Sequence, residues 1–159
     1  MNLTDAFLDY LLYERNYSLE TIEAYKKDLL QFEAFLRRES GEEKSLAEVD
    51  AREMRAWMVE LMDKGRATTT VNRKLSTLRS FYKFLLRQNI CRADPSRRVT
   101  GPKNKKKLPV FVKEAEMDRL LDDVDFGEGF EACRDRDIIE TFYLAGIRLS
   151  ELIGLKDVD

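Results

Sequence analysis

The sequence predicts a mainly α-helical protein whose N-terminal part is a compact four-helix bundle. Two observations favour this fold class. Apolar residues recur at spacings of three and four over long stretches, which is the period of a helix with one buried face. The 159 residues include only 7 Gly and 3 Pro, too few for a turn-rich β architecture, while a hydrophobic content of 43% is ample for a core.

Capping signals define the first two helices. Thr4 is expected to cap a helix over about residues 5–15, which residues 16 and 17 break. Ser18 is expected to cap a longer helix over about residues 19–39, which ends at Ser40 and Gly41. The inward-facing positions of this second helix step by three and four along the chain: Ile22, Tyr25, Leu29, Phe32 and Leu36.

Two further helices complete the predicted bundle. Asp50 followed by Glu53 forms a capping box for a helix over about residues 51–63, which Gly65 closes. A fourth helix is expected to begin at Thr68 or Thr69 and to extend to about residue 88. Its apolar stripe is Val71, Leu75, Leu78, Tyr82 and Leu85. Short connections between the four helices favour a bundle.

Composition predicts two domains joined by a basic linker. Residues 1–96 form the bundle, residues 97–108 are an exposed linker that is rich in Lys and Arg, and residues 109–159 begin a second domain. The second domain is expected to have an extended piece over 109–112, helices over about 114–122 and 134–145, a C-cap at Gly146 and a new turn at 148–151. Roughly 50 residues are too few to close a separate core, so we expect this domain to be truncated.

The net charge of −2 hides a strong polarisation along the chain. Residues 1–63 contain 8 basic and 15 acidic side chains, residues 64–107 contain 14 and 1, and residues 108–159 contain 6 and 14. The central block therefore carries a formal charge of +13, with Asp94 as its single acid. Such a block repels itself unless a polyanion faces it, and nucleic acid is the usual polyanion. A solvated helix face with a disordered tail is the alternative.

Polar and basic residues follow one side of the predicted fourth helix, away from its apolar stripe. They are Arg73, Ser76, Ser80, Lys83 and Arg87, flanked by Asn72 and Arg79. The major groove of DNA admits one helix, and Arg, Asn and Ser reach base edges and phosphates there. An ordinary solvated surface is the alternative, but such surfaces usually alternate in sign, and this helix has no acid on that side. We therefore expect this helix to contact DNA.

Two other groups of residues are weaker candidates for DNA contact. Ser18, Thr21, Lys26 and Lys27 could hold a phosphate at the N-terminus of the second helix, although a plain N-cap beside surface lysines explains them equally well. Lys105, Lys106 and Lys107 could follow the DNA backbone, or serve only as a solubilising hinge.

Several protein classes are disfavoured by the same sequence. The N-terminus has no signal-peptide pattern, and no apolar stretch is long enough to span a membrane. Cys91 and Cys133 lie in unrelated contexts and favour reduced thiols in a cytoplasmic protein. The absence of His excludes ordinary His-based metal sites and His general bases within the chain, and no cofactor is expected.

Three segments resemble the tyrosine recombinases, specifically the Xer and phage-integrase type. They are LETIEAYKKDLLQFEAF at 19–35, TTVNRKLSTLRSFYKFL at 69–85 and RDRDIIETFYLAGIRLSELIGL at 134–155. The last is the most specific, because the family pattern is close to G-L-R-x-S-E-L and this chain has GIRLSEL at 146–152. Asp94-Pro95 stands where many relatives have Asn-Pro.

The resemblance implies a four-helix, SAM-like core-binding domain followed by a catalytic domain, which together clamp double-stranded DNA. In this family a tyrosine forms a 3′-phosphotyrosyl link to DNA without a metal or cofactor, and two arginines stabilise the transition state. Arg148 matches the first of these arginines, and Glu151 matches an acidic position that orients its neighbours. The alternative for Arg148 is a surface arginine paired with Glu151. The family usually assembles as tetramers on DNA.

The family's other catalytic residues have no counterpart in this chain. A hairpin Lys, a His-x-x-Arg box, a further His or Trp, and the nucleophilic Tyr all follow the matching region. None of the six tyrosines has a matching context, and Tyr25 and Tyr82 are expected in the core. We therefore expect a recombinase fragment that binds DNA without cutting it. A stand-alone DNA-binding regulatory module and a helical protein–protein adaptor are the competing interpretations.

Overall fold

A computed structural model describes residues 2–41, 44–104 and 111–156. The chain divides into two compact units, Met1–Lys106 and Lys107–Asp159, and each is described by itself. Every regular element within the described ranges is helical, which confirms the mainly α prediction. The extended piece predicted at 109–112 falls partly outside these ranges, and Phe111 and Val112 belong to no helix.

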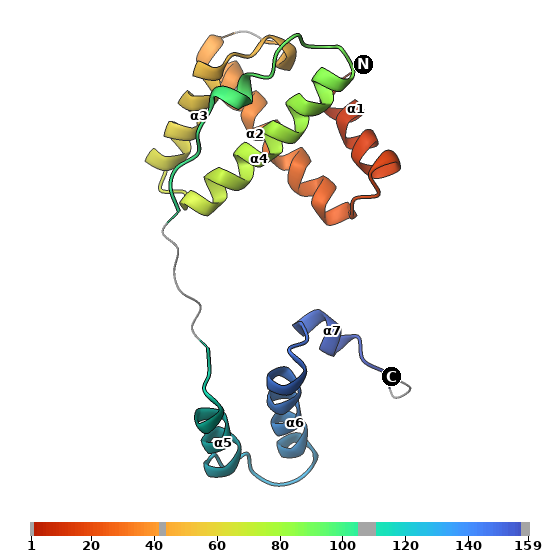
Figure 1. Cartoon of the computed structure of the whole chain (residues 1–159), viewed down its shortest axis with the longest axis vertical. Helices are drawn as coiled ribbons and strands as arrows, with labels where there is room; N and C mark the ends of the chain where they lie inside the picture. The colour runs from red at the N-terminus through yellow and green to blue at the C-terminus, as the bar shows by residue number, and fades with distance from the viewer. Residues whose placement is uncertain (1, 42–43, 105–110, 157–159) are drawn as a thin grey trace. The chain divides into compact units, whose positions relative to one another are not determined.

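Four α-helices build the first unit (Figure 1). They are α1 (Leu3–Asp9), α2 (Leu19–Ser40), α3 (Ala51–Asp63) and α4 (Thr68–Arg87). Three short elements connect or follow them: the π-helix η1 (Tyr10–Glu14) and the 3₁₀ helices η2 (Leu46–Glu48) and η3 (Pro95–Arg98). α4 crosses α2 and also packs against α3.

Most of the predicted caps are present. The Ser18 side chain accepts a hydrogen bond from the Thr21 amide, Gly41 ends α2 in the left-handed region, and Asp50 and Glu53 form the capping box of α3. The prediction for Thr4 is wrong, because the helix starts at Leu3 and the Asn2 side chain caps it. Thr4 is 2% exposed, and its hydroxyl donates instead to the Glu33 carboxylate at 2.8 Å.

The core of the first unit lies where the apolar stripes of the four helices meet. Its largest fully buried side chains are Trp57, Tyr82, Phe7, Phe32 and Phe81. Tyr82 is in the core, as predicted, and its hydroxyl donates to the Leu46 carbonyl at 2.7 Å. Burial raises the pKa of Tyr82 well above the ordinary value of tyrosine, so this phenol stays protonated. Tyr25 is only partly buried.

The first residues of the predicted linker pack against the bundle. Ser96 and Val99 are buried, and η3 contacts both α3 and α4. The Arg55 guanidinium donates to the Arg98 carbonyl, and the Arg79 guanidinium donates to the Val99 carbonyl, each at 3.0 Å. Within residues 97–99 the side chains of Arg97 and Arg98 are exposed, as predicted, but the Val99 side chain is buried and arginines of the bundle bind two of the carbonyls. Residues 105–108 of that linker lie outside the described residues.

The second unit contains α5 (Glu114–Asp123), α6 (Phe130–Ala145) and α7 (Leu149–Ile153). α6 begins four residues before the predicted start at 134, with Gly129 at its N-cap, and Gly146 caps its C-terminus as expected. Among the described residues of this unit, only Met117 and Ala132 are buried hydrophobic side chains, while large ones such as Phe130 and Ile153 are at least three-quarters exposed. The unit by itself therefore has almost no core.

The described residues contain neither a membrane-spanning helix nor a metal-binding cluster. No helix there has the length and apolar character needed to cross a membrane. The same ranges hold no group of three or more His, Cys, Asp or Glu side chains arranged to bind a metal ion.

Candidate nucleic-acid interface

One side of α4 carries the seven residues of this helix that the sequence assigned to DNA contact. At 3.6 residues per turn they fall within an arc of about 120°, so they share one face of the helix. Arg73, Ser76, Arg79, Lys83 and Arg87 are exposed, while Asn72 and Ser80 are partly buried. We call these seven residues the α4 face.

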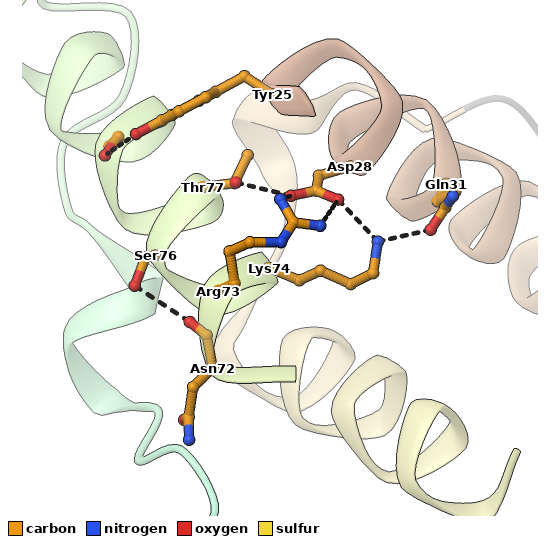
Figure 2. Close-up of polar contacts among 9 residues, drawn as sticks. Tyr25, Asp28, Gln31, Asn72, Arg73, Lys74, Ser76 and Thr77 are labelled. Carbon is orange, nitrogen blue, oxygen red and sulfur yellow. Dashed lines mark hydrogen bonds and ion pairs between the residues drawn. The ribbon is translucent and has the colours of Figure 1, made fainter. Parts of the chain in front are cut away.

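The α4 face is not free of acid in three dimensions, because α2 brings Asp28 against one edge of it (Figure 2). The Asp28 carboxylate is 1% exposed and accepts four hydrogen bonds. Arg73 donates two of them, at 2.6 and 2.8 Å, and the Lys74 ammonium donates a third at 2.7 Å. The Thr77 hydroxyl donates the fourth at 2.8 Å. Asp28 therefore neutralises part of the charge that the sequence assigned to DNA.

Lys74 is the buried cation of this cluster. Its side chain is 7% exposed, against 52% for Arg73. The Lys74 ammonium also donates to the Gln31 side chain at 2.6 Å and lies 5.8 Å from the ring centroid of Trp57. The cluster of Asp28, Arg73 and Lys74 thus keeps one net positive charge and joins α2 to α4.

Sequence reasoning missed Asp28 and Lys74, although one signal was present. Asp28 lies three residues after Tyr25 and four before Phe32, so it shares the inward stripe of α2. A carboxylate on such a stripe needs a cationic partner, because an unpaired buried charge is costly. The pattern could have placed Asp28 inside, but it could not have identified a partner on another helix.

The opposite edge of the α4 face holds the segment that follows η3. The Asn72 side-chain amide donates to the Pro102 carbonyl at 2.8 Å and to the Asn104 side chain at 3.2 Å. Arg79 donates to the Val99 carbonyl, as described above. Gly101 passes so close to Asn72 that a Cβ atom there would collide with the Asn72 amide oxygen. These two residues of the face therefore also hold the first unit together.

Side chains in the middle and C-terminal part of the face make fewer hydrogen bonds to the rest of the first unit. The Ser76 hydroxyl donates back to the Asn72 carbonyl at 3.0 Å, and the Ser80 hydroxyl lies 3.5 Å from the Tyr25 hydroxyl. Arg87 donates to the Tyr10 hydroxyl at 3.2 Å. Within the described ranges, the Lys83 side chain has no hydrogen bond or ion pair. Lys83 is therefore the cation of the face that is most available to a ligand.

The N-terminus of α2 lies beside the α4 face. A groove of about 350 Å³ lies here, and its polar lining combines one acid with one cation. It is lined by Glu20, Thr21, Ala24 and Tyr25 from α2 and by Arg73, Ser76 and Thr77 from α4. The Ser18 hydroxyl caps α2 by accepting from the Thr21 amide and also lies 3.1 Å from the Thr21 hydroxyl, but Ser18 itself does not line this groove. Lys26 is exposed on α2 but does not line the groove. The predicted contacts at Lys105, Lys106 and Lys107 lie outside the described residues.

Arg148 and Glu151 lie together in the second unit. Arg148 is the N-cap of α7, and its backbone amide and its guanidinium both donate to the Glu151 carboxylate, at 2.7 and 3.1 Å. The Arg148 side chain is 82% exposed. Because exposed pairs of this kind are weak, at about 0.2–1 kcal/mol, the guanidinium remains free to exchange Glu151 for another anion.

Comparison with known proteins gives the family of the chain. Tyrosine recombinase XerC of Listeria monocytogenes serotype 4a is 42% identical over 159 residues, which are 99% of this chain and 52% of the relative. Tyrosine recombinase XerC of Halalkalibacterium halodurans is 43% identical over 156 residues, covering 97% and 50% of the two chains. The chain spans about half the length of these curated relatives.

A solved structure and a family model agree with these relatives. The integrase of the transposon Tn1549, solved in complex with circular intermediate DNA, has a TM-score of 0.67 and 18% identity to this chain, covering all of it and 50% of the integrase. That likeness concerns the fold alone. The family model described as "Phage integrase, N-terminal SAM-like domain" matches residues 4–89, more than half of the chain. The predicted resemblance is thereby confirmed, and the chain belongs to the family of phage integrases with an N-terminal SAM-like domain.

Proposed function

We propose that this chain is the DNA-binding part of a site-specific tyrosine recombinase and that it holds duplex DNA against the α4 face and the N-terminus of α2. The observation that carries the proposal is the α4 face, which gathers four cations, two serines and an asparagine within one arc of a single helix. Small serines between the cations let the helix axis approach a DNA backbone closely. Membership of the phage-integrase family supports duplex DNA over an acidic protein as the partner.

The full-length protein cleaves and rejoins DNA in this proposal. A tyrosine hydroxyl attacks a backbone phosphorus and forms a 3′-phosphotyrosyl bond, while the bond to the 5′ oxygen breaks and a 5′-hydroxyl leaves. That hydroxyl later attacks the partner strand, so the bond energy is conserved, and neither a metal nor a cofactor is required. Arg148 stabilises the charge on the pentacoordinate phosphate by bidentate hydrogen bonds, and Glu151 orients Arg148.

The 159-residue chain alone binds DNA without cutting it in this proposal. None of its tyrosines has the context of the family's nucleophile. The nearly coreless second unit supports its assignment as the beginning of a catalytic domain, because a complete domain would bury side chains such as Phe130 and Ile153. We place the full-length protein in the cytoplasm, as a tetramer on DNA.

A binding assay with Lys83→Ala tests the DNA-binding role, because Lys83 makes no described contact that its loss would break. The matched control is Arg52→Ala on α3, whose side chain is 89% exposed and does not line the groove at the α4 face. Fluorescence anisotropy of a labelled duplex should show weaker binding for Lys83→Ala, a salt slope of log K lower by about 1, and no change for the control. Equal affinity of Lys83→Ala and the wild type would contradict the role of the face.

A cleavage assay tests the catalytic part of the proposal. With a nicked duplex substrate, the 159-residue chain should form no covalent adduct with DNA, whereas the full-length protein should form one. In the full-length protein, Arg148→Ala should abolish the adduct while leaving duplex affinity largely unchanged. A covalent adduct with the short chain would disprove its assignment as a binding fragment.

A further inference from the structure

A recess of about 450 Å³ lies between the start of the first unit and the C-terminal half of α4. Apolar side chains of Phe7, Leu11 and Phe84 line it together with three cationic side chains, Arg15, Lys83 and Arg87. Lys83 and Arg87 belong to the α4 face, but Arg15 follows η1 and was not among the residues that the sequence assigned to DNA. We call this hollow the η1–α4 recess.

A change of helix type places Arg15 at the recess. The Arg15 amide donates to the Tyr10 carbonyl at 3.2 Å, five residues earlier, and the Tyr17 amide donates to the Leu11 carbonyl at 3.0 Å. Asn16 then takes a left-handed conformation, with φ of 51°, which turns the chain towards α2. Single π-helical turns are rare and occur frequently at functional sites. This irregular turn makes Arg15 a neighbour of α4 instead of the next residue of a straight helix.

The charges that line the recess are all positive. Its lining includes no Asp or Glu among the residues that the structure describes. Arg87 is held in place, because its guanidinium lies 5.7 Å from the ring centroid of Tyr10 and donates to the Tyr10 hydroxyl. Both of these contacts are to an uncharged side chain, so no described carboxylate compensates the positive charge of Arg87. Three cations gathered without a counter-ion repel one another, and an anion in the recess would remove that cost.

We infer that the η1–α4 recess binds a backbone phosphate of duplex DNA and that Arg15 is a DNA-contacting residue. The inference rests on the proposed DNA-binding function. Two of the three cations also belong to the α4 face, so a duplex that lies on that face passes the recess. Guanidinium groups suit this ligand, since they bind phosphate oxygens by paired hydrogen bonds. An acidic segment of another protein would also neutralise these charges. Duplex DNA is favoured because its regular row of phosphates can contact the α4 face and the recess at the same time.

Binding of the full 159-residue chain to labelled duplexes of about 30 base pairs tests the inference, measured between about 50 and 200 mM NaCl. Arg15→Gln should weaken binding about fivefold to tenfold and lower the salt slope by about 1, equally on duplexes of unrelated sequence. Arg15→Lys should restore most of the slope, because a phosphate contact needs the charge. The charge-matched control, Arg52→Gln, should bind as the wild type does. Arg15→Gln should also keep the wild-type unfolding temperature, since its side chain makes no described hydrogen bond or ion pair.

Three outcomes would overturn the inference in distinguishable ways. If Arg15→Gln binds with wild-type affinity and slope, Arg15 is not a DNA-contacting residue and the inference fails, whereas weaker binding by Lys83→Ala would still support the proposed function. If Arg15→Gln weakens binding to only one duplex sequence, Arg15 contacts a base and not a phosphate. If the wild-type chain fails to bind any duplex at about 50 mM NaCl, the proposed function fails and the inference fails with it.

Discussion

Replacing Asp28 by Asn should destabilise the first unit more than any change on the α4 face. The substitution keeps the shape of the side chain but removes the negative charge that Arg73 and Lys74 share. Arg73 is half exposed and can turn towards water at little cost. Lys74 cannot, because its side chain is 7% exposed. Breaking a buried pair by removing one partner costs about 3–5 kcal/mol, so we expect the free energy of unfolding to fall by about that amount.

Companion variants separate this explanation from a general packing defect. The double variant Asp28→Asn/Lys74→Met also removes the cation that Asp28→Asn leaves buried and unpaired. It should recover most of the lost free energy of unfolding, since an apolar replacement of a buried pair is often neutral. Arg73→Ala should cost only about 1–2 kcal/mol, because Asp28 keeps Lys74 and Thr77. The control is Glu23→Gln, which breaks an ion pair with Lys27 whose two side chains are both 71% exposed. It should change the stability by less than about 0.5 kcal/mol.

Urea unfolding followed by tryptophan fluorescence is the suitable assay. Trp57 is the single tryptophan of the chain and lies in the core of the first unit, so its signal reports this unit and not the second one. A thermal scan should show a drop of at least about 12 °C, since 1 kcal/mol corresponds to about 4–8 °C in a domain of this size. A loss below about 1 kcal/mol for Asp28→Asn, or no recovery in the double variant, would refute the reasoning.

Three other predictions concern the reactivity of the two cysteines, the pH dependence of stability at Asp50 and the packing at Gly101. Burial and the neighbouring Asp94 raise the pKa of the Cys91 thiol, so alkylation followed by mass spectrometry should label the exposed Cys133 first. Hydrogen bonds from α3 amides lower the pKa of Asp50, so the charge of Asp50 stabilises the fold above the ordinary pKa of an aspartate. The stability advantage over Asp50→Asn should therefore shrink as the pH falls below about 4. Gly101→Ala should cost about 1–2 kcal/mol by displacing the Asn72 amide, and no further loss should appear when it is combined with Asn72→Ala.

Much of the fold could be predicted from the sequence because it depends on local signals. Capping residues such as Ser18 and Asp50 and the apolar stripes of α2 and α4 act over a few residues, and the structure contains them as expected. The wrong prediction for Thr4 has the same origin. Asn2 offers an equally good cap two residues earlier, and the distant Glu33 takes the Thr4 hydroxyl. The cap at Asn2 is itself a local signal that competes with Thr4, whereas the contact with Glu33, 29 residues away, is not visible in a local pattern.

The candidate site was less predictable because its chemistry depends on contacts between helices. The pattern along α4 identified which residues share a face, but Asp28 comes from α2, 45 residues before Arg73. Asn72 and Arg79 also acquire structural partners from the segment after η3, which the composition indicated to be an exposed linker. Arg15 reaches α4 only through a π-helical turn, a feature that no periodicity of the sequence indicates.

These partners change how the positive charge of the α4 face should be counted. Asp28 cancels one charge at the Arg73 edge, whereas Arg79 and Arg87 bind uncharged oxygen atoms and Lys83 binds none that is described. The one net positive charge of the cluster of Asp28, Arg73 and Lys74 is shared with the buried Lys74. Apart from that cluster, the face offers about three uncompensated cations to phosphates, and Arg15 would add a fourth. Only a fraction of the central +13 block is thus involved in this surface. The slope of log K against log salt concentration reports how many phosphates the protein neutralises. A slope much steeper than expected for four phosphates would therefore have to come from basic residues outside the α4 face and the η1–α4 recess.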